Sequence, residues 1–456
     1  MKRLAFSIII FLSSLSANAA TYTTVPLRGV NLSGAEFGSK LCASCIPTLD
    51  DSTTFTTAGM NTFRVPIKWS YLQPSLNGDL DTSYLQQIHD YTQTLLEAGY
   101  NVIIDLHAYM RFSPNQEAGS GQIAAADQVA DVWSKLTSTS ATNGFNQLAK
   151  TYDGRNKPNQ LIFDLMNEPN TMSTNLALDA ENAAIQSIRD NNLTNLVLIE
   201  GNNWTGLHSW TTSKGTDGLT NADAFTPSSI HDAANNYAIN VHQYFDSNFS
   251  GASETCINPG SQSDLLNQIK WNEFIDWAKA NKLKLFVTEF GSANNQQCSK
   301  DIDWFLSAIE DNAYTEQAGY GFIGWTAWSA GHAWGTGYVL GLNPGDLAAP
   351  LLDSTYSKHL SGDSSCTGYI LSFKNTPVSI STGYSMQIYN ASWSSKTTLL
   401  TQTDPATTPA SICVAKEFVD DRYAALYDQA GSQYVCSQQI SVSSNILDLK
   451  TCVANS

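Results

Sequence analysis

The chain has 456 residues, of which 42% are hydrophobic and 14% charged. This composition excludes wholesale disorder and allows one large domain with a small second one. Its 24 basic residues face 41 acidic ones, for a net charge of −17, which disfavours nucleic acid and anionic lipid as partners. A neutral polymer is the compatible large partner, although an acidity that only maintains solubility explains the charge equally well.

The first twenty residues resemble an export signal. Lys2 and Arg3 form a positive start, residues 4–12 an apolar run, and residues 17–19 a cleavage site of small residues. The apolar run is too short to span a bilayer. We therefore expect residues 1–20 to be a cleaved signal peptide, and the protein to be secreted (extracellular) without a membrane partner.

Eight short apolar runs alternate with segments of helical pattern from residue 27 onward. The runs cover residues 27–31, 62–66, 102–106, 161–166, 196–200, 238–241, 283–288 and 321–325. Most are continuously apolar without alternation, which is typical of strands buried on both faces. Strand and helix repeated eight times predict an α/β fold, a (β/α)8 TIM barrel over residues 21–360. A doubly wound open sheet is the alternative.

Helix signals occupy the segments between these runs. Asp81 is expected to cap a helix that buries Leu85 and Ile88 on one face and ends at Gly99. Ser263 is expected to cap another helix. That helix would run through Leu266, Ile269, Phe274, Trp277 and Ala278.

The chain changes character after residue 360. Residues 361–365 read as a linker, and the remainder consists of short runs rich in Ser, Thr and β-branched residues, at 369–373, 377–380 and 386–389. We predict a small β-rich, disulfide-stapled domain over residues 366–456, whose role the sequence does not indicate.

An even number of cysteines in an exported chain predicts disulfides. The eight are Cys42, Cys45, Cys256, Cys298, Cys366, Cys413, Cys436 and Cys452. Cys256 and Cys298 flank one strand–helix unit, so we expect them to pair. Cys42 and Cys45 have a zinc-like spacing, but no second pair or nearby histidine follows, and no metal site is predicted there.

Polar and aromatic side chains follow most of the predicted strands. In a barrel such groups converge at one mouth, because the carboxyl ends of all the strands lie there. Among them are two glutamates, Glu168 after the fourth strand and Glu289 after the seventh. A carboxylate pair about 5–5.5 Å apart suits retaining glycoside hydrolysis, and one about 6.5–9.5 Å apart suits inversion. Strands four and seven face each other, so the shorter separation is feasible.

The ordered set of strand-end motifs resembles glycoside hydrolase family 5, most of all its cellulase-type endoglucanases, over about residues 25–350. The set comprises Arg64, His107, Asn167-Glu168-Pro169, His242-x-Tyr244, Glu289-Phe290-Gly291 and Trp328. The resemblance implies a retaining endo-β-1,4-glucanase that acts on β-glucan polysaccharide, most simply as a monomer, with no cofactor. Mannan, xyloglucan and mixed-linkage glucan remain alternative substrates, and a non-catalytic carbohydrate-binding protein is the alternative from another class.

The resemblance also implies a role for each matching residue. Glu168 would be the acid/base and Glu289 the nucleophile. The supporting set would be Arg64 and Tyr244 on the nucleophile, His242 on the acid/base, Asn167 on the sugar 2-hydroxyl, His107 on the substrate and Trp328 as a stacking platform. From the residues alone, Tyr109 is expected on the same strand face as His107, two positions away. Four tryptophans near strand ends could line subsites or fill the core: Trp69, Trp204, Trp325 and Trp334. Of these, we predict Trp204 and Trp325 as substrate-binding residues.

Overall fold

A computed structural model describes residues 25–37, 45–114, 120–155, 157 and 159–360, together with the backbone of eight strands between residues 369 and 454. The predicted signal peptide, the linker at 361–365 and the predicted run at 377–380 lie outside the described residues.

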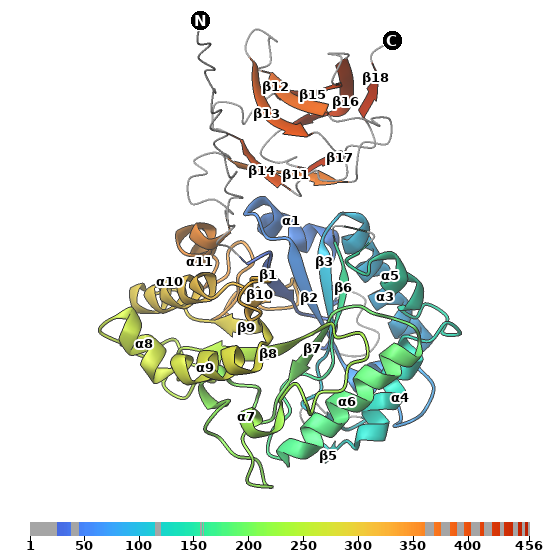
Figure 1. The fold of residues 1–456 in the computed structure, drawn as a ribbon, viewed down its shortest axis with the longest axis vertical. Coiled ribbons are helices and arrows are strands. Elements are labelled where there is room, and N and C mark those ends of the chain that lie inside the picture. The colour runs from blue at the N-terminus through green and yellow to red at the C-terminus, as the bar shows by residue number, and fades with distance from the viewer. Residues whose placement is uncertain are drawn as a thin grey trace, which may run out of the picture.

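Eight parallel strands close into a barrel, in the order β1-β10-β9-β8-β7-β6-β3-β2 (Figure 1). They are β1 (Leu27–Leu32), β2 (Thr62–Ile67), β3 (Asn101–Leu106), β6 (Leu161–Asp164), β7 (Val197–Glu200), β8 (Tyr237–Tyr244), β9 (Lys284–Gly291) and β10 (Gly321–Ala330). β1 pairs with both β2 and β10, so the sheet has no edge. This closure confirms the (β/α)8 prediction and excludes the open sheet, and each predicted run overlaps one of these strands.

Helices surround the barrel, with α3 to α6 along one side in Figure 1 and α8 to α10 along the other. They are α1 (Leu49–Thr57), α2 (Trp69–Leu72), α3 (Thr82–Glu97), α4 (Ala126–Leu136), α5 (Asn146–Thr151), α6 (Thr174–Asp190), α7 (Asn221–Ala224), α8 (Gln262–Gln268), α9 (Trp271–Asn281), α10 (Gln296–Asp311) and α11 (Pro350–Ser354). Two 3-10 helices, η1 (Leu207–Ser209) and η2 (Tyr356–His359), and a hairpin of β4 (Arg111–Phe112) and β5 (Gln122–Ile123) complete this part.

Helix α3 forms as the sequence predicts. Asp81 caps it by accepting a hydrogen bond from the backbone N–H of Tyr84 at 2.9 Å, and its apolar stripe, including Leu85 and Ile88, is buried. The single helix predicted from Ser263 is wrong.

Two helices replace it. Ser261 caps α8 by accepting from the N–H of Asp264, and α8 ends at Gln268. Lys270 then adopts a left-handed backbone with φ of 58°, which a right-handed helix cannot accommodate. The apolar spacing continues through the break because Ile269 and Phe274 are buried in the same core, so periodicity alone could not reveal it.

The inside of the barrel is closed at its amino-terminal end by apolar side chains. A compact cluster consists of Leu27, Ile103, Ile162, Leu196, Leu198, Ala238 and Phe286. A much larger core fills the space between strands and helices. This apolar cluster lies beneath the polar residues at the carboxyl ends of the strands. It shields them from water at the amino-terminal end of the barrel.

The described part beyond residue 366 consists of strands, as the sequence predicts. They are β11 (Tyr369–Lys374), β12 (Tyr384–Tyr389), β13 (Lys396–Gln402), β14 (Ser411–Val414), β15 (Arg422–Asp428), β16 (Gln433–Ile440), β17 (Ile446–Asp448) and β18 (Cys452–Ala454). They form a sheet of order β14-β11-β17 and another of order β13-β12-β15-β16-β18.

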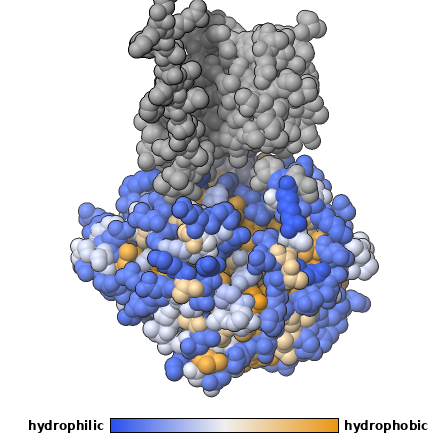
Figure 2. Space-filling view, viewed as in Figure 1, coloured by the Kyte–Doolittle hydropathy of each residue, from blue (hydrophilic) through white to orange (hydrophobic). Residues whose placement is uncertain are grey.

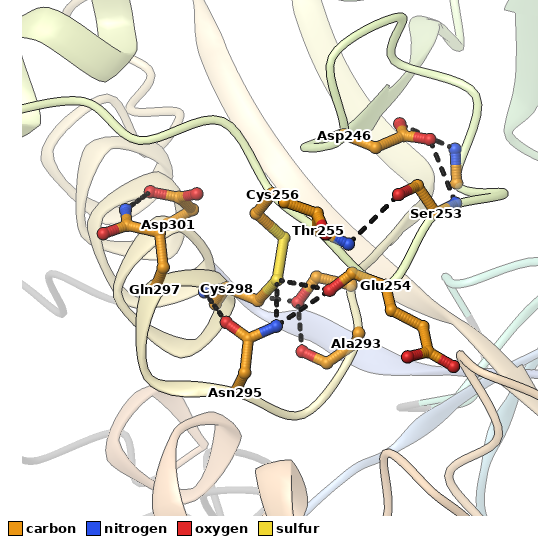
Figure 3. The surroundings of a disulfide bond; sticks show 12 residues. Asp246, Ser253, Glu254, Thr255, Cys256, Ala293, Asn295, Gln297, Cys298 and Asp301 are labelled. Atoms are coloured by element: carbon orange, nitrogen blue, oxygen red, sulfur yellow. Dashed lines mark hydrogen bonds between the residues drawn. A yellow bond between two sulfur atoms is a disulfide. The ribbon is translucent and has the colours of Figure 1, made fainter.

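The predicted disulfide between Cys256 and Cys298 is present and closes 42 residues of chain (Figure 3). It ties the loop after β8 to the first turn of α10. Asn295 supports the same junction: it accepts from the N–H of Cys298 at 2.9 Å and donates to the carbonyl of Glu254 at 2.9 Å. Cys45 is also disulfide-bonded.

This loop folds around a buried aspartate. The Asp246 carboxylate accepts from the backbone N–H groups of Gly251, Ala252 and Ser253 at 3.0–3.3 Å (Figure 3). Gly251 lies against the ring of Tyr244, where a Cβ would come within 2.6 Å of a ring carbon. The disulfide therefore anchors a segment that packs on one of the predicted site residues.

Replacing both Cys256 and Cys298 with alanine is expected to lower the free energy of unfolding by about 2–4 kcal/mol, because the unfolded chain regains the freedom of a loop of this length. Urea unfolding followed by tryptophan fluorescence measures the loss. Each single variant should lose about as much as the double variant, since either change removes the same bond. Single losses that add up to the double loss would show that the two side chains contribute separately and not through the bond.

The face of the barrel shown in Figure 2 is mostly hydrophilic, with hydrophobic residues scattered among hydrophilic ones. Within the described part, four large hydrophobic side chains are exposed: Leu49, Ile123, Trp204 and Leu347. None of the helices described is long and apolar enough to cross a membrane.

Candidate active site

Arg64 lies at the centre of a buried polar cluster at the carboxyl ends of the strands. Its side chain, on β2, is fully buried. The guanidinium faces Glu289 (2.7 Å), Asp164 (2.8 Å), Asn167 (2.8 Å), Asn31 (3.0 Å), Asp105 (3.0 Å) and Glu200 (3.5 Å). A guanidinium is never deprotonated in practice and presents a fixed fork of donors, so it can orient several acceptors at once.

Glu289 lies on β9 and points to the barrel axis. Its Oε1 accepts from Arg64, and its Oε2 accepts from the hydroxyl of Tyr244 at 3.0 Å. The next residue, Phe290, points outward and packs on Trp325. Gly291 follows where a Cβ would lie 2.6 Å from the backbone oxygen of Trp328, which explains the glycine of this motif.

The charges around Glu289 keep it ionised. Burial alone would raise the pKa of its carboxyl, but the cations of His242, Arg64 and His107 outweigh burial and lower the pKa to about 2. A carboxylate held ionised and fixed by two hydrogen bonds has the properties of a nucleophile.

Glu168 lies in the loop that follows β6, which ends at Asp164, and its electrostatic environment differs from that of Glu289. Burial raises its pKa above the usual value for a glutamate, the negative charges of Glu289 and Glu200 add to this, and the hydrogen bond with His242 offsets only part of it. Its Oε1 lies 2.7 Å from Nδ1 of His242, and its side chain keeps 14% of its surface exposed. A carboxyl group of raised pKa at the opening has the properties of a general acid.

The two carboxyl groups lie side by side. One oxygen of Glu168, one oxygen of Glu289 and a ring nitrogen of His242 are all within 4.8 Å of one another. Among the described residues these three could also hold a metal ion. However, Arg64 and Tyr244 already donate to both oxygens of Glu289, so the donor set fits an acid and a nucleophile better than a cation.

His242 connects this pair to the strands behind it. Its Nδ1 faces Glu168, and its Nε2 lies 2.9 Å from the hydroxyl of Thr288 and 3.3 Å from Glu200. Burial would lower the pKa of the imidazole, but the charges of Glu289 and Glu200 raise it well above its usual value.

His107 and Tyr109 lie together at the mouth, but not for the predicted reason. β3 ends at Leu106, so neither residue is on the strand, and Tyr109 has a left-handed backbone with φ of 56°. The turn brings the Tyr109 hydroxyl to 3.2 Å from Nε2 of His107. Asp105 holds the other ring nitrogen at 2.7 Å, and it raises the pKa of His107 to about 9 against the effect of burial.

Trp328 forms one wall of the site. Its indole N–H donates to the hydroxyl of Tyr338 at 2.9 Å, and its ring stacks on His107 at an angle of 14°. Trp334 is half-buried and stacks on Tyr338. These flat rings, fixed beside the carboxylates, are suited to the C–H face of a sugar.

The other candidate tryptophans differ. Trp204, in the loop after β7, is 52% exposed, and its backbone N–H donates to the carbonyl of Pro169, the neighbour of Glu168. Trp325 is fully buried between Phe290 and Tyr356, so its prediction as a subsite residue is wrong. A register shift between Phe322 and Gly324 determines which β10 side chains face the axis. Trp69 is also buried in the core.

Several residues of the cluster were not predicted as site residues. They are Asn31, Asp164, Glu200, Asn240 and Thr288, all fully buried. Each interrupts an apolar run, and a polar group inside such a run needs a partner. A polar residue in an apolar run can be recognised in the sequence, but the sequence does not show which residue it contacts.

A (β/α)8 barrel with two neighbouring carboxyl groups at its carboxyl-terminal mouth, one of raised pKa and one of lowered pKa, defines a glycoside hydrolase. The sequence profile described as cellulase (glycosyl hydrolase family 5) matches residues 18–331. The chain therefore belongs to glycoside hydrolase family 5.

Individual relatives cover most of the barrel. Endoglucanase 1 of Robillarda sp. (strain Y-20) is 32% identical over 293 residues, which are 60% of this chain and 66%, just under two thirds, of that protein. Probable endo-β-1,4-glucanase B of Aspergillus oryzae is 30% identical over 69% of this chain and 84% of its own length. The structure of XacCel5A in complex with cellopentaose is 31% identical, with a TM-score of 0.59 over 74% of this chain and 99% of that one.

Proposed function

We propose that this protein is a secreted, retaining endo-β-1,4-glucanase that hydrolyses internal β-1,4-glucosidic bonds. The observation that carries the proposal is the pairing of Glu168 and Glu289. Their nearest oxygens lie within 4.8 Å, and their pKa values are shifted in opposite directions. This separation favours double displacement, because inversion needs room for a water between the carboxyl groups. The substrate follows the named activity of the relatives and the cellopentaose bound to XacCel5A.

In the first step, a Glu289 oxygen forms a bond to the anomeric carbon while the bond from that carbon to the leaving oxygen breaks. Glu168 gives its proton to that oxygen, and the product is a covalent glycosyl-enzyme. In the second step, Glu168, now a carboxylate, takes a proton from water. The water oxygen attacks the anomeric carbon, Glu289 leaves, and the sugar keeps its original configuration.

The surrounding residues would support these steps. Arg64 and Tyr244 orient Glu289, and His242 orients Glu168. The side-chain oxygen of Asn167 accepts a hydrogen bond from Arg64, and its Nδ2 has no partner among the described residues, which leaves a donor for the sugar 2-hydroxyl. Trp328 and His107 form the sugar-stacking wall of the reacting subsite, and the exposed ring of Trp204 offers a neighbouring one.

A panel of polysaccharides tests this function. The protein is assayed on carboxymethylcellulose, mixed-linkage glucan, xyloglucan and mannan, each beside the Glu289→Gln variant. We expect a rapid fall in the viscosity of carboxymethylcellulose that the variant does not cause. Activity confined to mannan or xyloglucan would keep the mechanism and change the substrate. Inactivity on all four, with binding retained, would instead indicate a carbohydrate-binding protein.

Secretion rests on the first twenty residues alone. N-terminal sequencing of protein collected from culture medium is expected to find a chain that begins near residue 20. Recovery of the uncleaved chain from the cells would overturn this part of the proposal.

A further inference from the structure

Glu200 lies behind the proposed acid/base, at the last position of β7. Its side chain is fully buried. One carboxylate oxygen, Oε2, accepts a hydrogen bond from the backbone N–H of Glu168 at 2.6 Å. The other, Oε1, accepts from Nδ2 of Asn240 at 2.9 Å and lies 3.3 Å from Nε2 of His242. The carboxylate therefore contacts both Glu168 and the histidine that holds its side chain.

The backbone of Glu168 needs such support. Its φ of 45° is left-handed, a conformation that costs a residue with a side chain free energy and persists only where the surroundings impose it. The peptide is held on both sides: Glu200 accepts from the N–H, and Nδ2 of Asn170 donates to the carbonyl oxygen at 3.1 Å. The hydrogen bond to Glu200 is the shorter one and involves a carboxylate, so it is the stronger restraint.

We propose that Glu200 is a positioning residue of the reaction: it fixes the strained peptide of Glu168 and the ring of His242 together, and so aims the acidic proton of Glu168 at the leaving oxygen. The inference rests on the proposed function. Glu200 itself lies below the carboxyl pair and touches no substrate. Its main effect should be on proton donation, because it contacts Glu168 at 2.6 Å and lies 3.3 Å from His242, whereas its contact with Arg64, which holds Glu289, is longer at 3.5 Å.

Glu200→Gln is the test variant. The glutamine has the same size, but its amide nitrogen cannot accept a hydrogen bond, so either the Glu168 N–H or Asn240 loses its acceptor. The matched control is Glu181→Gln. Glu181 is a buried carboxyl on α6 beside Glu200. Burial and the charges of Glu200 and Asp164 raise its pKa well above its usual value, which favours the neutral form, so an uncharged glutamine of the same size is a mild replacement.

The measurement compares two substrates. Cellotetraose has a leaving group that needs a proton, and 2,4-dinitrophenyl β-cellobioside has one that does not. For Glu200→Gln we expect kcat/KM to fall roughly 10- to 100-fold on cellotetraose and less than about threefold on the dinitrophenyl substrate. Glu181→Gln should change neither by more than about twofold. Equal losses on both substrates, or no loss on either, would overturn the inference.

A second variant and the activity of the native protein separate the role of Glu200 from the proposed function. If Glu200→Gln does not fold, Glu200→Asp keeps the charge beside Arg64 but withdraws it from the Glu168 N–H, and the same ratio between substrates is measured. A native protein that cleaves neither substrate would refute the proposed function itself, whereas a native protein that cleaves both and a variant without the selective loss would refute only the role of Glu200.

Discussion

Replacing Glu289 with alanine is expected to lower kcat on β-glucan by at least about 10⁴-fold, because no other group lies where the covalent bond to the sugar must form. The variant should still bind substrate, since Trp328 and His107 are unchanged. Glu289→Gln is the size-matched control and should be similarly inactive. Both variants need a check of unfolding by urea, because Arg64 loses a buried partner at 2.7 Å.

Azide tests the role of Glu289 directly. It is small enough to enter the space that alanine leaves, and it can attack the anomeric carbon of 2,4-dinitrophenyl β-cellobioside from that side. We expect partial recovery of activity and a glycosyl azide of inverted, α configuration, identified by NMR. A β-glycosyl azide from this variant would show that Glu289 is not the nucleophile, and would exchange its role with that of Glu168.

Replacing Glu168 with glutamine is expected to reduce kcat/KM on β-glucan about 10²- to 10⁴-fold, the usual contribution of a general acid. On the dinitrophenyl substrate the loss should be much smaller, because its leaving group departs without a proton. Azide should speed the second step of this variant and give the β product, since Glu289 still forms the intermediate. Equal losses on both substrates would contradict the assignment of Glu168 as the acid.

The pH profile of kcat/KM gives an independent check. The pKa of Glu168 is raised by burial, so the native enzyme keeps the acidic proton above the usual range of a glutamate and loses activity as the pH rises through that pKa. The pKa of Glu289 is lowered to about 2, so the acidic limb should lie below the usual range. Glutamine does not titrate, and the alkaline limb should be absent in Glu168→Gln. Its persistence would assign that limb to another group.

Much of the architecture was predictable from the sequence because strands buried on both faces are continuously apolar. All eight runs are barrel strands, and the bond between Cys256 and Cys298 was predicted from its place around one strand–helix unit. Helix boundaries were harder to predict. The stripe that continues through Ile269 and Phe274 hides the break at Lys270, because apolar spacing reports which face is buried and not whether the backbone stays helical.

Whether a tryptophan of β10 faces the site or the core could not be predicted from the sequence. Trp325 and Trp328 lie on the same strand, yet the former is in the core and the latter forms a wall of the site. The two are three positions apart, so the alternation of a strand places them on opposite faces. Which of them faces the barrel axis depends on a register shift earlier in β10, and the sequence carries no separate mark of that shift. Similarly, His107 and Tyr109 meet through a left-handed turn and not through the alternation of a strand.

By itself, the sequence determined the barrel, the identity of the polar residues at its strand ends and the resemblance that assigns them roles, since these depend on local pattern and chain order. Only the tertiary structure decided which of the two carboxyl groups has the raised pKa. Glu168 and Glu289 are the same amino acid and both are desolvated, and their pKa values separate because Glu289 faces Arg64 and two histidines, whereas the one histidine beside Glu168 only partly offsets burial and the neighbouring carboxylates. These charges come from five different strand ends, so their effects exist only once the barrel has closed.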